Sequence, residues 1–250
     1  MKFKTSLTLL LAALTCGAAQ AQYFPTKKGM TLHYEDKNTK ENITTSTVSA
    51  VEEAATAADG TVSVRIMDKT AIPGSEFGTI TSYTNCTYNP ADSVSTLVLM
   101  NADDYKESVY SLMTESIAQS GQFLSQSDLD DLKKNMRTKG ELAMAFGPNT
   151  PEGTKLPNKS IRLDVGPMSM SMNLWEGKVL GNETIEVPAG KFDCKKISYT
   201  LRTTTPEGTT KAYVTVWYAE GVGTVRTTHA DKKGNIESEQ ILQSVTAPAQ

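Results

Sequence analysis

The stretch from Glu186 to Arg226 constrains the fold most, because its turns and strand patterns are the clearest in the chain. Val187-Pro188-Ala189-Gly190 predicts a turn, since proline fixes φ and favours an extended residue before it, while glycine tolerates a positive φ. Thr205-Pro206-Glu207-Gly208 predicts a second turn, and a run of β-branched and aromatic residues follows from Lys211 to Tyr218. The stretch therefore predicts neighbouring antiparallel strands.

The apolar side chains of the first strand change parity part-way along it: Phe192 and Cys194 alternate in one phase, Ile197 and Leu201 in the other. An extra bulge residue near Lys195-Lys196 would produce this change and bend the strand. The glycine pair after the second strand also fits a bulge or a barrel-corner kink, because no helix follows it to hold a phosphate. We therefore expect a curved sheet.

Two segments carry a family resemblance: Val187 to Cys194 (VPAGKFDC) and Trp217 to Val225 (WYAEGVGTV). They resemble the TapB-like family, exported bacterial proteins of unknown function that are distantly similar to periplasmic lipoprotein-carrier half-barrel proteins. The resemblance implies a strongly curved antiparallel sheet, with helices in or across its concave face and often an apolar cavity. It brings no catalytic residues with it.

The first 21 residues have the pattern of an export signal. Two lysines come first, an apolar run follows, and Ala19-Gln20-Ala21 provides the small residues that a signal peptidase reads. We expect residues 1–21 to be a signal peptide cleaved after Ala21, and the protein to be periplasmic or secreted. Lipoprotein processing at Cys16 is the alternative, and it fits less well because the residue before the cysteine is not one of the usual small ones.

The mature chain is mildly acidic. Cleavage removes two of the 25 Lys and Arg residues and none of the 28 Asp and Glu residues, so the formal charge becomes 23 − 28 = −5. This balance argues against nucleic acid or an anionic membrane as a partner. Residues 22–250 are long enough for one domain with a sizeable core, and we expect a monomer.

The N-terminal third predicts an antiparallel meander. Apolar residues alternate in residues 30–35, and two hairpins are expected, one across Ala58-Asp59-Gly60 and one across Asn89-Pro90-Ala91-Asp92. At the end of the second turn, Asp92-Ser93-Val94 resembles the short O-glycosylation motif of exported Bacteroidetes proteins, although it is also ordinary turn chemistry.

The pattern becomes helical after Asn101. Apolar residues recur at helical spacing through Leu112 and Met113, and a second helix is expected from a cap at Ser127 through Met136. The predicted fold is mainly β (α+β): a strongly curved antiparallel half-barrel like the lipoprotein carriers. An inserted helical pair at about residues 102–138 is expected to cover its concave face.

Three methionines share one face of a predicted strand. Met168, Met170 and Met172 alternate with polar residues, and their flexible side chains suit the wall of a cavity for an apolar ligand, to which Leu112 and Met113 would contribute from the helix. Simple gap-filling against the helices is the alternative. Both interpretations stay open.

Cys86 and Cys194 are the only cysteines left after cleavage. An exported chain permits a disulfide between them, and two buried free thiols are the alternative. Apart from these, the sequence has no metal-ligand spacing, nucleophile elbow or phosphate loop. We therefore expect no cofactor and no enzymatic activity, with an uncharacterised hydrolase as the alternative.

Two functions stay open. The first is a periplasmic protein that binds or carries a lipid or another apolar ligand in the concave face. The second is a structural or envelope-assembly protein with a filled core, which contacts an envelope protein partner through its outer surface. Fold alone does not distinguish them, because one fold hosts many functions.

Overall fold

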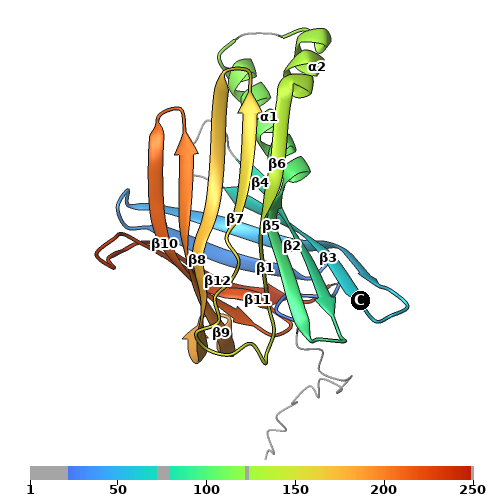
Figure 1. Ribbon diagram of the computed structural model, residues 1–250, viewed down its shortest axis with the longest axis vertical. Coiled ribbons are helices and arrows are strands. Elements are labelled where there is room, and N and C mark those ends of the chain that lie inside the picture. Colours follow the sequence, from blue (N-terminus) through green and yellow to red (C-terminus); the bar gives the residue numbers. More distant parts are fainter. Residues whose placement is uncertain (1–21, 72–78, 122–123, 249–250) are drawn as a thin grey trace, which may run out of the picture.

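The computed structural model describes residues 22–71, 79–121 and 124–248, which form twelve antiparallel strands and two helices (Figure 1). The elements are β1 (Thr31–Asn38), β2 (Ile43–Thr56), β3 (Val62–Ala71), β4 (Thr79–Asn89), β5 (Val94–Asn101), α1 (Ala102–Gln119), α2 (Gln126–Asn135), β6 (Met136–Phe146), β7 (Lys159–Val165), β8 (Met168–Val187), β9 (Gly190–Thr205), β10 (Gly208–Ala219), β11 (Gly223–Ala230) and β12 (Ile236–Thr246). The predicted cleavage site after Ala21 and the alternative site at Cys16 lie outside the described residues.

The sheet closes into a barrel. Each strand pairs with its neighbours in sequence, and β1 also pairs with β12, from Thr31 opposite Thr246 to Asn38 opposite Ser238. The meander and both predicted hairpins are confirmed, but the predicted half-barrel is wrong. Turn patterns report only on strands that follow one another in the chain, so they could not show that the first and last strands meet.

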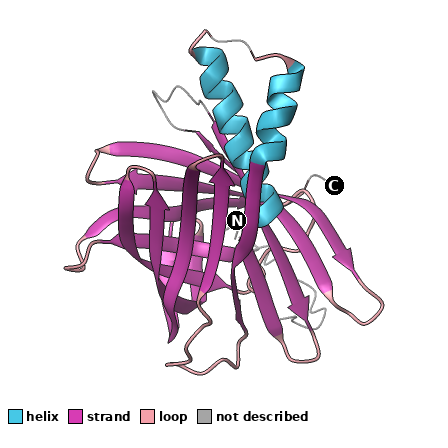
Figure 2. Cartoon of the chain, turned by 45° about the horizontal axis from the view of Figure 1, so that its top comes forward, coloured by secondary structure: helices cyan, strands magenta, loops and turns pink. Residues whose placement is uncertain are grey.

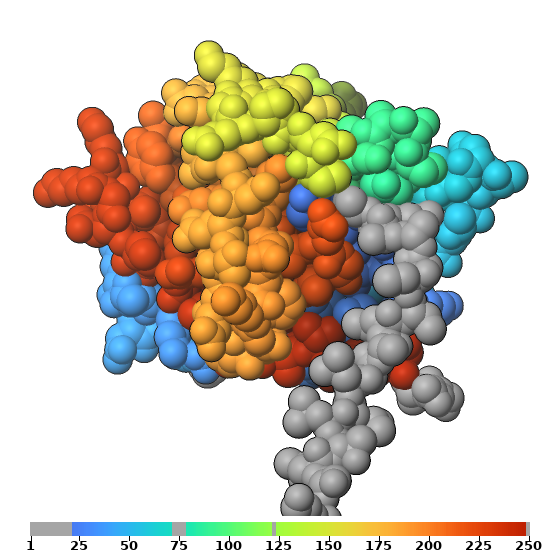
Figure 3. All heavy atoms as spheres, turned by 90° about the horizontal axis from the view of Figure 1, so that it is seen from below, coloured from blue at the N-terminus to red at the C-terminus, as the bar shows by residue number. Residues whose placement is uncertain are grey.

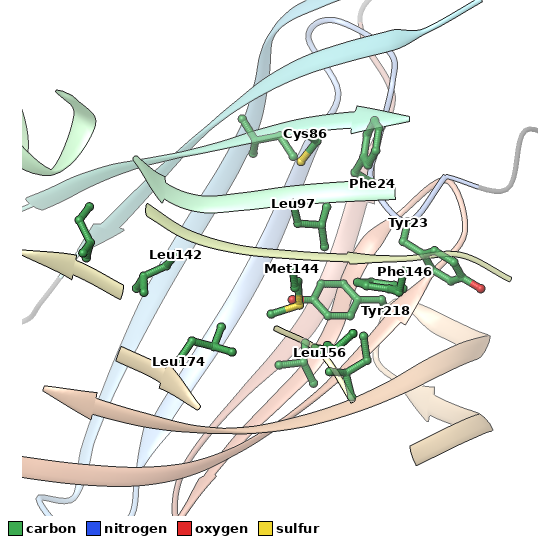
Figure 4. Packing of buried hydrophobic residues seen from close by; sticks show 14 of the residues in the cluster. Tyr23, Phe24, Cys86, Leu97, Leu142, Met144, Phe146, Leu156, Leu174 and Tyr218 are labelled. Atoms are coloured by element: carbon green, nitrogen blue, oxygen red, sulfur yellow. The ribbon is translucent and has the colours of Figure 1, made fainter. Parts of the chain in front are cut away.

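The barrel interior is a packed hydrophobic core. Inward-facing residues alternate along the strands, and Ile161 and Leu163 of β7 are completely buried. Figure 4 shows part of this cluster, in which Phe146 lies between Tyr23 and Tyr218, with ring centroids 5.0 and 5.2 Å away. The residues just after the predicted cleavage site therefore belong to the core.

Two register shifts bend the long β8–β9 hairpin. They lie on β8, between Trp175 and Lys178 and between Val179 and Gly181, and the second is opposite Lys196. The bulge was predicted on β9 near Lys195-Lys196. It lies opposite these residues on β8 instead, since β9 pairs with β10 without a shift. Seen from below, this hairpin crosses the end of the barrel as an orange ridge (Figure 3).

A second apolar cluster explains the parity change in β9. It joins the end of the β8–β9 hairpin to the strands that close the barrel and comprises Leu32, Tyr34, Ile185, Cys194, Trp217, Ala219, Val225 and Leu242. Cys194 faces this cluster and Ile197 faces the barrel core. Lys195, between them, is 3% exposed, and its Nζ donates to the carbonyl oxygens of Pro148 at 2.9 Å and Thr150 at 3.3 Å.

The two helices form a hairpin at one end of the barrel (Figures 1 and 2). α1 packs against β4, β5, β6 and β7, with Tyr105 as its one buried residue, whereas no residue of α2 is buried. The prediction that the helical pair covers a concave face is therefore wrong. The barrel is closed, its core is filled mainly by strand side chains, and of the two helices only α1 contributes substantially to the packing.

The second helix begins and ends earlier in the chain than predicted. Its N-cap is Ser125, not Ser127, and Asp128 completes the capping box. The helix ends at Asn135, and Met136, expected as its last apolar residue, begins β6 and is 2% exposed. Strand β6 is absent from the sequence prediction because its start continues the helical spacing of apolar residues.

Candidate functional site

An apolar groove lies between α1 and the strands at the helical end of the barrel. Its volume is about 680 Å³, within the range of roughly 300–1,000 Å³ typical of small-molecule pockets. Three segments line it: one side of α1, the start of β8 and the turn between β9 and β10. The lining residues are Val109, Leu112, Met113, Ser116, Ile117, Met168, Met170, Thr205, Pro206 and Glu207.

Helical spacing divides α1 between the core and the groove. Val109 and Met113, four residues apart, pack partly against the barrel core and also reach the groove wall. Leu112 and Ser116, also four residues apart, lie beside them on the groove side. Since α1 packs against β4 to β7, the groove is the space that it leaves toward β8 and the β9–β10 turn.

The structure brings together four of the five predicted ligand-binding residues. Leu112, Met113, Met168 and Met170 all line the groove. Met172 shares the strand face and packs against the barrel core, as Met113 and Met170 also do in part, and this packing is what the gap-filling alternative proposed. Met168 is 45% exposed, so the groove opens to solvent on its side.

The β9–β10 turn completes the groove, and the sequence did not place it there. Pro206 and Glu207 were predicted as turn residues, and the turn is confirmed. Their position opposite α1 depends on the curvature of the whole sheet. No local pattern carries that information.

An ion pair fixes the start of α1 to the barrel wall. Asp104 accepts hydrogen bonds from Arg65 of β3 at 2.7 and 3.2 Å, from Asn85 of β4 at 3.0 Å and from Asn101, the helix N-cap, at 2.6 Å. Burial alone would raise the pKa of Asp104, but these hydrogen bonds lower it below its usual value. The predicted helix-start carboxylate therefore has a structural partner on the strands.

Both cysteines are buried free thiols. Cys86 belongs to the barrel core and Cys194 to the second apolar cluster. Burial raises the pKa of both thiols, that of Cys194 to about 12. The sequence left a disulfide and two buried free thiols as alternatives, and the structure has the free thiols.

The barrel interior also holds a carboxylate. Asp68 of β3 follows the inward-facing Val64 and Ile66 at strand spacing, lines a small cavity of about 90 Å³ and accepts a hydrogen bond from the Ser49 hydroxyl. Burial raises its pKa to about 6, and the hydrogen bond from Ser49 lowers it in part. Such an environment disfavours the charged form.

In the described part of the chain, no three His, Cys, Asp or Glu side chains lie close enough together to bind a metal ion. Of the helices in residues 22–71, 79–121 and 124–248, none has the length and apolar character needed to cross a membrane.

A family model decides where the chain belongs. The DUF3108-like model matches residues 108–242, which run from the first turns of α1 to the last strand and include the whole groove. The chain belongs to the DUF3108-like family. The finer TapB-like assignment stays a prediction. No curated protein matches the chain.

Two solved structures have the same fold. One is a candidate lipoprotein of Parabacteroides distasonis, with a TM-score of 0.65 and 18% identity over 90% of this chain and 99% of that one. The other is a candidate exported protein of Bacteroides fragilis described as having a YmcC-like fold, with a TM-score of 0.64 and 18% identity over 91% of this chain and all of that one. At this identity the likeness of this DUF3108-like protein extends to the fold alone.

Proposed function

We propose that this DUF3108-like protein is exported and binds one acyl chain, or an apolar ligand of similar shape, in the groove beside α1, without catalysing a reaction. The observation that carries the proposal is the convergence of Leu112, Met113, Met168 and Met170 on one space of about 680 Å³. Methionine walls adapt to ligands of variable shape. If the methionines only filled gaps in the core, they would not need to lie next to an open groove.

Burial of an acyl chain provides enough free energy for stable binding. Burying an acyl chain of about 14 methylenes contributes on the order of 10 kcal/mol, before the cost of ordering the ligand is subtracted. The groove is open beside Met168, so part of the chain stays in water and the net gain is smaller. Micromolar to nanomolar binding fits this balance.

Export is supported by the signal pattern of residues 1–21 and by the two structures of similar fold, one described as a lipoprotein candidate and the other as an exported-protein candidate. A periplasmic or secreted binding protein would use the groove to keep an acyl chain away from water. The protein partner that delivers or receives such a ligand would be another envelope component.

Native mass spectrometry of the mature protein, expressed through its own signal and purified without detergent, tests the proposal. We expect a bound mass in the lipid range, and saturable binding of a fluorescent fatty acid to protein that has been stripped of lipid. A clean apo mass together with no saturable fatty-acid binding would refute the proposal.

A matched pair of variants shows whether the groove is the site. Ser116 lines the groove and Ser111, on the same helix, lines a different, polar depression beside β4. Both serines are exposed, so tryptophan at either position is expected to leave the core intact. Ser116→Trp should weaken fatty-acid binding at least tenfold because the indole fills the groove, whereas Ser111→Trp should bind like the wild type.

The alternative is a structural or envelope-assembly protein. The observation that favours it is the filled barrel interior, where the cavity beside Asp68 measures about 90 Å³ and has room for only a few waters. On this alternative, Ser116→Trp would change neither lipid content nor function, and the protein would act through its outer surface.

A further inference from the structure

The outer face of β8, β9 and β10 carries a compact set of aromatic and cationic side chains. Trp175, Thr200 and Tyr213 are directly opposite one another on the three strands. The next row, two residues along each strand, contains Asn173, Arg202 and Lys211. These six residues are called the outer patch below.

Strand parity separates the outer patch from the groove. Leu174 and Leu201, the neighbours of Trp175 and Arg202 in sequence, pack into the barrel core. Since successive side chains of a strand point to opposite faces, the outer patch faces away from the interior. Any ligand bound here is independent of the acyl-chain groove.

Two aromatic rings in the outer patch keep part of their surface in contact with solvent. Trp175 is 36% exposed and Tyr213 is 37% exposed. They stand two strands apart, which is about 9–10 Å. An extended ligand, rather than a single small ring, is needed to contact both.

The cations of the outer patch lack a counter-charge. Arg202 and Lys211 are directly opposite on adjacent strands, where like charges destabilise a sheet. Within the described residues neither forms an ion pair, and the buried Nε of Arg202 has no hydrogen-bond partner. The guanidinium lies 5.4 Å from the centre of the Trp175 ring, which orients it beside the aromatic surface.

One carboxylate contacts the outer patch: Glu176 accepts a hydrogen bond from the Thr200 hydroxyl at 3.2 Å. The remaining outward positions around the cations are hydroxyl and amide side chains, which can both donate and accept hydrogen bonds. They are Ser171, Asn173, Thr204 and Thr209.

We propose that the outer patch binds an acidic oligosaccharide. Aromatic faces are negative at the centre and attract the weakly positive C–H face of a sugar ring, so Trp175 and Tyr213 would each stack on one sugar. Arg202 and Lys211 would bind its carboxylate or phosphate groups, and the surrounding hydroxyls would bind its hydroxyls. A nucleic acid, the other extended polyanion with rings, fits poorly because its binding uses several cations along the phosphate backbone, and the outer patch has two, Arg202 and Lys211.

Tryptophan fluorescence provides a direct test, because the chain has two tryptophans and only Trp175 is in the outer patch. Trp217 is 6% exposed and belongs to the second apolar cluster. The full mature protein is titrated with a four-unit oligogalacturonic acid, with its fully methyl-esterified form, and with inorganic phosphate. We expect saturable binding of the acid, at least tenfold weaker binding of the ester, and no displacement of the acid by an equal concentration of phosphate.

Single substitutions locate the site. Lys211→Gln and Arg202→Gln should each weaken binding of the acid by about 10–100-fold, the loss expected for a hydrogen bond to a charged group. Trp175→Phe should abolish the fluorescence change. Arg162→Gln is the matched control, because Arg162 lies on the adjacent strand β7 and is already paired with Asp164 at 2.8 Å, so binding should stay within twofold of the wild type.

Three kinds of result would overturn the proposal. The first is no saturable binding of the acid, and the second is equal binding of acid and ester, which would remove the role of the cations. The third is an equal loss in the Arg162 control or full displacement by phosphate, either of which would mean non-specific attraction of anions. None of these results bears on fatty-acid binding in the groove, so the two proposals succeed or fail separately.

Discussion

Replacing Asp68 by asparagine should make the protein more stable at neutral pH and leave its stability unchanged in acid. Burial raises the pKa of Asp68 from 3.8 to about 6, so the folded protein holds this proton more tightly than the unfolded chain. Stability therefore falls as pH rises between these two values. A shift of about two units corresponds to about 3 kcal/mol at pH 7, since each unit is about 1.4 kcal/mol. Asparagine stays neutral, and its Oδ1 can still accept the hydrogen bond from Ser49.

Urea unfolding of both proteins at intervals from pH 4 to pH 8 measures this effect. The stability difference should be close to zero at pH 4, grow through pH 5 and 6, and level off above pH 7 in favour of the variant. Asp59→Asn is a control, because a hydrogen bond from the backbone N–H of Thr61 lowers the pKa of Asp59, so its titration falls below this range and the stability difference for this variant should stay nearly constant from pH 4 to pH 8. A difference for Asp68→Asn that stays constant with pH would refute the reasoning.

Two further predictions concern packing. Gly140 has a φ of +85°, and a Cβ there would lie 2.2 Å from the carbonyl oxygen of Ser160, whereas Gly166, with a φ of +55°, has open space around it. Gly140→Ala should therefore cost about 1–3 kcal/mol more than Gly166→Ala in urea unfolding, and equal costs would contradict the clash. Asp104→Ala removes the carboxylate partner of Arg65 and should cost about 1–3 kcal/mol. Hydrogen exchange should then be faster in α1 than in the barrel strands, and uniform exchange would contradict the anchoring role.

The sequence predicted individual strands better than their assembly. The hairpins around Asp59 and Pro90 and the turns before Lys191 and after Pro206 are all present, because glycine, proline and aspartate specify turns locally. Closure between β1 and β12 has no local signal. Strand β6 was missed for a different reason, since Met136 fits both the end of a helical stripe and the start of a strand.

The groove was predictable in its residue types and not in its shape. Helical spacing correctly put Leu112 and Met113 near Val109, and strand alternation correctly grouped Met168 with Met170. Which of these residues meet depends on how far α1 leans toward β7, and that is set by long-range contacts such as the one between Asp104 and β3. The outer patch was missed because its cations and rings come from three strands, with no spacing in sequence to connect them.

The pairing of β1 with β12 has a consequence for the order of folding. All the other strand pairs join consecutive strands and can form as the chain emerges, but the last seam joins segments about 200 residues apart. Pairing β1 with β12 has the largest entropic cost of loop closure among the strand pairs, so this step is expected to be slow. Until β12 (Ile236–Thr246) has paired with them, β1 and β11 both present an unpaired edge to other chains, and this last strand therefore protects the molecule from edge-to-edge aggregation.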